Sequence, residues 1–212
     1  MMRTISHIAT GGVVAAALFA GGAQAAVLYS NGPYDGAIDG LAISYGYSVA
    51  DAFTAIDGSA ATDVAFVTWN SPGDTASTVD WEITSGNPLG GGAFDVLGSG
   101  TAATSATDIG LNGSGYDLQT NSFSVGSVTL TGGDYWLLLQ NAYAANGDPV
   151  AWDVNNGPAA GWDSTLGAVN SETFTVSGDA VPEPTGWSLM LLGLGGLGAR
   201  LRSRRGAAAA SL

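Results

Sequence analysis

The segment Val79-Asp80-Trp81-Glu82-Ile83 places apolar side chains at every second position and acidic side chains between them. Successive side chains of a β-strand point to opposite faces, so this alternation indicates a strand with one buried face and one face in water. The same period of two recurs around Phe123 and Val125 and around Phe174 and Val176, with serine or threonine at the polar positions. The chain is therefore expected to be built from strands, with Trp81 inside and Glu82 outside.

Two further segments, 64–69 and 135–139, are apolar at nearly every position, which is typical of central strands covered on both faces. Turn-forming pairs separate the apolar segments: Asn31-Gly32, Pro72-Gly73, Gly132-Gly133 and Asn146-Gly147. About seven to nine short strands at this spacing predict an all-β fold, a jelly-roll-like antiparallel β-sandwich of two sheets, over residues 26–180. A short helix over residues 47–55 is the one exception that the sequence leaves open.

All five basic residues of the chain are Arg3 and four arginines from Arg200 onward, and the single histidine is His7. Of the chain's 18 acidic residues all but Glu183 lie in residues 26–181, which leaves seventeen acids and no cationic side chain there. Nucleic acid and anionic lipid headgroups are excluded as direct partners of this domain, because both are bound through lysine and arginine.

The same composition excludes several kinds of active site. Residues 26–181 contain neither histidine nor cysteine, so no Ser-His or Cys-His nucleophile and no histidine- or cysteine-based zinc site can be built there. The chain has no cysteine at all, so the domain must be stable without disulfides. Carboxylate chemistry and oxygen ligation of Ca²⁺ are what remains.

The first residues of the chain have the pattern of a signal peptide. Arg3 supplies positive charge, residues 13–20 form an apolar core, and Ala23-Gln24-Ala25 is a small-x-small cleavage pattern. Signal peptidase is expected to remove residues 1–25 and to leave Ala26 as the first residue of an exported protein.

The segment after residue 180 begins with Val181-Pro182-Glu183-Pro184 and continues with thirteen residues, 187–199, that are all apolar, glycine or serine. A helix of this length spans about 20 Å, so with its flanking residues it predicts a short transmembrane helix. A basic cluster follows, which should stay in the cytoplasm and orient the helix, with the domain outside: Arg200, Arg202, Arg204 and Arg205. Residues 206–212 form a short tail.

These three features, in this order over residues 181–205, resemble the PEP-CTERM sorting signal. The resemblance implies processing by exosortase, a membrane protease-transpeptidase of Gram-negative bacteria that make exopolysaccharide, with Pro182, Glu183 and Pro184 as the processing motif. The domain itself resembles the choice-of-anchor ectodomains of such proteins through residues 28–33 and 147–152. That second resemblance implies a surface location and no activity.

Two sets of side chains in the domain are candidates for ligand binding. The first comprises Trp152, Asp153, Asn156 and Trp162, a combination of aromatic rings and short polar groups that suits a carbohydrate. The second comprises two loops that could each bind Ca²⁺ through oxygen ligands, one with Asp35 and Asp39 and the other with Asp153 and Asn155. The alternatives are that both tryptophans close one end of the sandwich and that the Asp and Asn residues cap turns.

A glycosidase would need two carboxylates converging in a cleft. The domain has only two glutamates, Glu82 and Glu172, and both are expected to face outward from alternating strands. The chain is thus expected not to be an enzyme. The sequence favours an exported structural or adhesive protein of the cell surface or exopolysaccharide matrix; the alternative is a protein resembling a carbohydrate-binding module that recognises extracellular polysaccharide.

Overall fold

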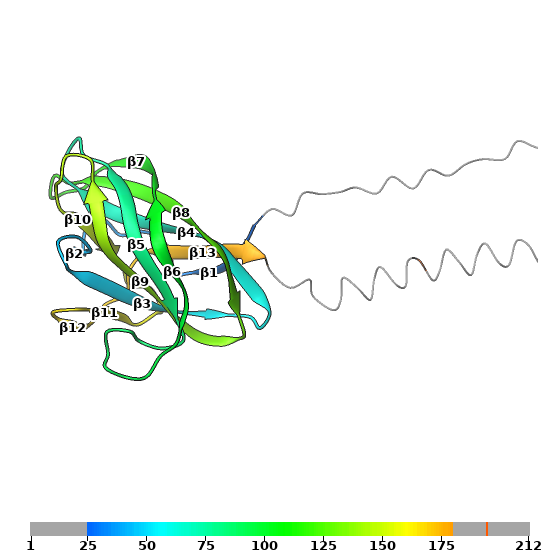
Figure 1. Ribbon diagram of the computed structural model, residues 1–212. Coiled ribbons are helices and arrows are strands. Elements are labelled where there is room, and N and C mark those ends of the chain that lie inside the picture. The colour runs from blue at the N-terminus through cyan, green and yellow to red at the C-terminus, as the bar shows by residue number, and fades with distance from the viewer. Residues whose placement is uncertain (1–24, 180–193, 195–212) are drawn as a thin grey trace, which may run out of the picture.

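The computed structural model describes residues 25–179 and residue 194. The described part of the chain is an all-β domain (Figure 1). Its strands are β1 (Ala26–Ser30), β2 (Asp39–Ala42), β3 (Ser48–Ala55), β4 (Ser59–Asn70), β5 (Ala76–Thr84), β6 (Val96–Ala103), β7 (Ser105–Leu111), β8 (Asp117–Leu130), β9 (Gly133–Ala144), β10 (Val150–Val154), β11 (Gly161–Asp163), β12 (Gly167–Val169) and β13 (Phe174–Asp179).

The strands are more numerous than the sequence predicted, because β2, β11 and β12 are only four, three and three residues long. Strands this short show too few alternations to be recognised from the period of their side chains. Residues 48–55 form β3, so the short helix left open at 47–55 is wrong. Its core-facing side chains are Val49, Asp51 and Phe53, which follow the period of a strand.

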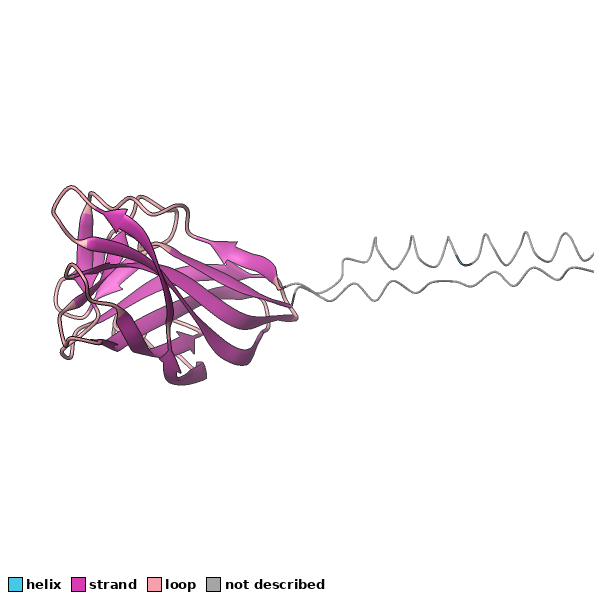
Figure 2. Ribbon diagram, turned by 90° about the horizontal axis from the view of Figure 1, so that it is seen from above, coloured by secondary structure: helices cyan, strands magenta, loops and turns pink. Residues whose placement is uncertain are grey.

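Two antiparallel sheets form the domain, as Figure 2 shows from above. One sheet has the order β12-β11-β3-β9-β5-β6. The other is centred on β4, which pairs with β8 along one edge, and β8 pairs in turn with β7. The opposite edge of β4 is shared: β13 pairs with residues 60–66 and β10 with residues 68–70. Outside these two lie β1 and β2, respectively.

One hydrophobic core fills the space between the sheets. The rings of Trp81 and Phe123 lie 6.3 Å apart across this space, and those of Phe53 and Phe174 lie 6.2 Å apart. Trp81 is 6% exposed, whereas Glu82 lies on the opposite side of β5 and is half-buried. The predicted fold class, a sandwich of two antiparallel sheets, is confirmed, as is the predicted orientation of β5.

The two ends of the domain lie together. β1 runs antiparallel to β13, with Ala26 opposite Gly178, so the domain begins and finishes at the same end of the sandwich (Figure 1). Residues 1–24 of the predicted signal peptide, the Pro182-Glu183-Pro184 motif, the apolar run 187–199 and the arginine cluster lie outside the described residues. Among the residues that are described, none belongs to a helix with the length and hydropathy needed to cross a bilayer.

Candidate functional site

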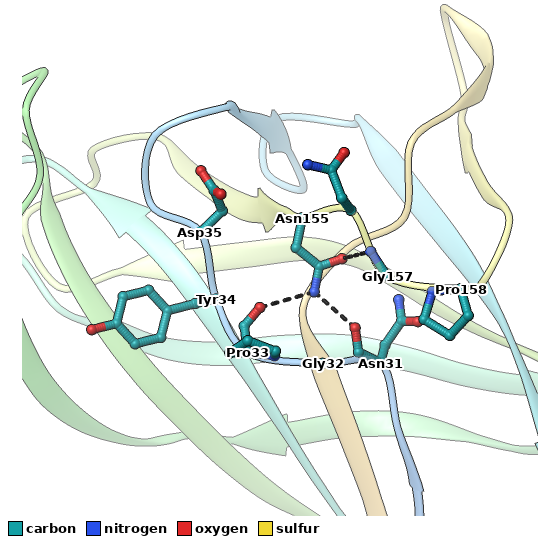
Figure 3. A pocket seen from close by; sticks show the side chains of 9 residues that line it. Asn31, Gly32, Pro33, Tyr34, Asp35, Asn155, Gly157 and Pro158 are labelled. Carbon is teal, nitrogen blue, oxygen red and sulfur yellow. Dashed lines mark hydrogen bonds between the residues drawn. The ribbon is translucent and has the colours of Figure 1, made fainter.

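Two turns face each other and line a shallow pocket of about 330 Å³ (Figure 3). One turn, residues 31–35, follows β1, and the other, residues 155–158, follows β10. Asn155 joins them: its Nδ2 donates to the carbonyl oxygens of Asn31 at 2.9 Å and Pro33 at 3.1 Å. Its Oδ1 accepts hydrogen bonds from the Gly157 amide at 2.8 Å and from Ser171 Oγ at 2.9 Å. We refer to this pocket as the turn pocket.

The turns pack so closely that only glycine fits at the contact. A Cβ atom on Gly157 would lie 2.3 Å from the Asn31 carbonyl oxygen, which is far inside van der Waals contact. Gly32 has φ +92°, a conformation that other residues rarely adopt. The repeated Asn-Gly-Pro sequence, 31–33 and 156–158, therefore reflects two turns that are shaped to fit each other.

Exposed side chains at the rim give the turn pocket its chemistry. Tyr34 is 46% exposed, and Asp35 and Asn156 are also exposed. Asp35 Oδ1 accepts hydrogen bonds from the amides of Ala37 and Ile38, which fixes the turn. A ring, an amide and a carboxylate at one rim can stack on and hydrogen-bond a neutral hydroxylated ligand. An anionic ligand would be repelled.

Asp153 does not lie at the surface as the glycan and Ca²⁺ predictions required. It is 0% exposed, and both carboxylate oxygens are occupied. Oδ1 accepts from Trp69 Nε1 at 2.6 Å and the Gly36 amide at 3.0 Å. Oδ2 accepts from Thr173 Oγ1 at 2.8 Å and the Asp35 amide at 3.1 Å. Asp153 thus fastens the 34–36 loop to the sheet, and its prediction as a ligand-binding residue is wrong.

The prediction that Trp152 binds a glycan is also wrong. Its side chain is 0% exposed, its Nε1 donates to the Thr173 carbonyl oxygen at 2.8 Å, and its ring packs edge-on against Phe66 and Phe174. A ring enclosed in the core offers no face to a sugar. The alternative, that this tryptophan is a packing residue, is the correct one.

Of the two loops predicted to bind Ca²⁺, the one with Asp153 and Asn155 is buried and has its polar atoms already hydrogen-bonded, whereas the one with Asp35 and Asp39 is exposed. Asn155 is 3% exposed with both amide atoms hydrogen-bonded, and Asp153 is saturated by its four donors. Asp35 and Asp39 remain exposed, and Asp39 Oδ1 accepts from the neighbouring Gly40 amide. Across residues 25–179 no three acidic side chains converge closely enough to hold a metal ion.

Trp162 lies on the outward face of the six-stranded sheet. In the register of this sheet Trp162 is opposite Ala50, Ala50 is opposite Leu138, and Leu138 is opposite Glu82. Trp136 lies on the same face, opposite Ala52. Both tryptophans are half-buried, and Ala50 and Leu138 are buried although they do not belong to the main core. The two indoles are carried by β11 and β9, which are separated by β3, so the two strands lie about 10 Å apart. We refer to this surface as the tryptophan face.

Two carboxyl groups, those of Asp51 and Glu172, lie directly behind the turn pocket, and neither was predicted from the sequence to be part of a site. Asn31 Nδ2 donates to Asp51 Oδ2 at 2.9 Å and to the Glu172 carbonyl oxygen at 2.6 Å. Glu172 is 0% exposed, so its predicted outward orientation is wrong. Tyr29 Oη donates to Asn31 Oδ1, and burial, with the nearby Asp51, raises the pKa of Tyr29. The period of two offered a signal for Glu172, which stands two residues before the buried Phe174.

Comparison with known proteins identifies the segment that follows the domain. Residues 180–205 match the PEP-CTERM protein-sorting motif, beginning one residue after β13 ends at Asp179. None of the curated proteins compared with the chain matches it. The motif implies export, membrane-anchored sorting and processing by exosortase. The chain therefore carries a PEP-CTERM protein-sorting motif directly after an all-β domain, and this motif implies an exported protein that exosortase processes.

Proposed function

We propose that this protein is a structural or adhesive component of the cell surface or exopolysaccharide matrix of an exopolysaccharide-producing Gram-negative bacterium. The sorting motif at residues 180–205 carries this proposal, because it implies an exported protein that is processed by exosortase. The pairing of β1 with β13 also supports this role, because it places both ends of the domain at the same end of the sandwich. A chain held through the segment after Asp179 presents β2, β10 and β11 away from its attachment (Figure 1).

The role that we propose is not catalytic. Glu82 lies on the tryptophan face and Glu172 in the interior, so the two glutamates of the domain do not share a cleft. A carboxylate glycosidase needs both acids within reach of one sugar linkage. Seventeen acids without a cation in residues 26–181 suit a highly hydrated protein that remains soluble in a polysaccharide matrix.

Processing is the first test. We expect the protein recovered from the cell surface to begin near Ala26 and to end near residues 182–184, because both ends carry processing patterns. Intact-mass analysis measures both ends at once. In cells that lack exosortase, and in a Pro182→Ala/Pro184→Ala double variant, residues 187–205 should stay attached. Their retention in cells with a working exosortase would show that the tail is an anchor and not a cleavage signal.

A second function, binding of neutral glycans, is favoured by one specific observation. The tryptophan face carries Trp136 and Trp162 on one side of the six-stranded sheet, with small side chains at Ala50 and Ala52 between them. Glu82, Ser99 and Gln140 supply polar groups to the same face. Aromatic rings can stack on the apolar faces of sugars, and polar groups beside them can bond hydroxyls. This surface replaces the predicted one that included Trp152.

Substitution of single aromatics separates the two candidate glycan surfaces. If the tryptophan face binds, Trp136→Ala and Trp162→Ala should each weaken binding to a neutral polysaccharide about tenfold, and Tyr34→Ala in the turn pocket should not. If the turn pocket binds, the pattern reverses. Affinity electrophoresis in gels containing a panel of neutral glycans measures this, with Tyr116→Ala, an exposed aromatic in the turn before β8, as control. Unchanged mobility of the wild-type protein in every gel would reject glycan binding and leave the structural role as the only proposed function.

A further inference from the structure

Asp51 and Glu172 approach each other from opposite sheets inside the core. Asp51 lies in β3 between Val49 and Phe53, whose side chains are all in the interior. Glu172 is bridged to Val154 of the other sheet and stands two residues before Phe174, so it follows the inward-facing period of β13. Both acids are 0% exposed. The sandwich therefore encloses two carboxyl groups that face each other.

Hydrogen bonds account for only one of the four carboxyl oxygens. Asp51 Oδ2 accepts from Asn31 Nδ2 at 2.9 Å and from the Glu172 backbone amide at 2.6 Å. Asp51 Oδ1 and both Oε atoms of Glu172 have no donor among the described residues. A buried carboxylate without donors is costly, and two adjacent ones repel each other as well. A proton on one of the acids removes one charge and supplies the missing donor.

The surroundings of the pair offer no positive charge. On β11, the side chain of Asp163 faces the same interior, with its Oδ1 bonded to the amides of Thr165 and Leu166 and to the Thr165 hydroxyl. On β1, the hydroxyl of Tyr29 lies on the other side of Asn31. Residues 26–181 contain no lysine, arginine or histidine, so no cation of the domain can pair with either acid.

We propose that Asp51 and Glu172 form a carboxylic acid–carboxylate pair that retains a proton in the folded domain at neutral pH and joins the two sheets behind the turn pocket. The proton resides on the Glu172 carboxyl group, which donates a hydrogen bond to the Asp51 carboxylate. Asp51 is the charged partner because its Oδ2 already accepts two hydrogen bonds. Asn31 connects the pair to the turn pocket through its bonds to Asp51 and to the Glu172 carbonyl oxygen. Loss of the proton in alkaline solution leaves two charges facing each other and weakens this end of the sandwich.

The direction of the titration agrees with the geometry. Burial, and after it the charge of Asp51, raises the pKa of Glu172 to about 10. Burial raises the pKa of Asp51 to about 7, although hydrogen bonds from Glu172 act in the opposite direction. Unfolded carboxyl groups titrate near pH 4, so the folded state binds more protons than the unfolded state above that pH. Stability is therefore greatest in mild acid and falls as the pH rises through about 7 toward about 10.

Unfolding of the purified full chain between about pH 8 and pH 9 tests the proposal, because exposed carboxyl groups and Asp51 are already ionised there and Glu172 is not. One retained proton should make the unfolding equilibrium constant rise about tenfold per pH unit. In Glu172→Gln the amide supplies the donor without a charge, so the slope should vanish. Glu82→Gln removes the same formal charge from the outer face and should keep the wild-type slope. A slope in Glu172→Gln equal to that of the wild type would overturn the pair.

A second measurement does not depend on the variant folding. At pH 7 the folded wild-type protein should show the infrared carbonyl band of a protonated carboxylic acid, and the band should be lost in alkali; its absence would overturn the proposal. Addition of Ca²⁺ tests whether the pair binds a cation. If CaCl₂ abolishes both the pH slope and the acid band, and NaCl of equal ionic strength does not, the pair holds a cation in place of the proton and the proposal is wrong.

Discussion

Trp81→Asp is expected to leave the domain unfolded at room temperature. Trp81 is 6% exposed and packs against Phe123 of the opposite sheet. Loss of a buried tryptophan costs about 3–5 kcal/mol, and an unpaired carboxylate in its place adds a further desolvation cost. Because domains of this kind are stable by only about 5–15 kcal/mol, the sum removes most or all of the stability. Near-ultraviolet circular dichroism and chemical denaturation measure the effect.

Glu82→Gln is the matched control for this substitution. It changes the next residue of the same strand, but the side chain lies on the outward face, so the expected change in unfolding free energy is within about 0.5 kcal/mol. Equal melting temperatures of the two variants would mean that β5 is turned over in solution relative to the structure described above.

Asp153→Ala is expected to have the second-largest effect. The substitution removes the acceptor for Trp69 Nε1, Thr173 Oγ1 and the amides of Asp35 and Gly36. Buried donors left without a partner cost about 1–3 kcal/mol each, so even two of them give a loss of about 2–6 kcal/mol. The 34–36 loop should also lose its attachment to the sheet. Urea denaturation measures the first effect, and hydrogen exchange at the Gly36 amide measures the second.

Asp39→Ala controls for the loss of one negative charge in the same region. Asp39 is exposed and accepts only from the amide of its own neighbour Gly40, so its removal should change the unfolding free energy little. If Asp153→Ala were as mild as Asp39→Ala, the buried hydrogen bonds of Asp153 would not exist in solution, and its prediction as a surface ligand would have to be reconsidered.

The sequence predicted what depends on local periodicity and composition. The inward orientation of Trp81, Phe123 and Phe174 followed from alternation alone, and the structure confirms it. The β10–β11 region was harder to interpret. Trp152 and Asp153 are flanked by Asn and Gly residues that are typical of surface loops, yet they belong to β10, which lies between β2 and β4. Burial there depends on strand pairing between distant segments, which no short sequence window contains.

Glu172 shows a different limit of sequence reasoning. Its alternation with Phe174 and Val176 indicated an inward side chain, whereas its charge indicated an outward one, and charge is usually the better guide. The decisive fact was the position of Asp51 and Asn31 across the core, 121 and 141 residues away in the chain. A polar group can be buried where distant partners satisfy it, and those partners become visible only in the folded structure.

The placement of β13 between β1 and β4 also has a mechanical consequence. A force applied to the attached end of the protein enters the domain at Asp179 and runs along β13, which is hydrogen-bonded to a neighbour on each edge. Both ladders are then loaded in shear, so their bonds share the load and do not open one after another. Under the C-terminal attachment proposed above, such loading would resist peeling of the C-terminal strand from the domain.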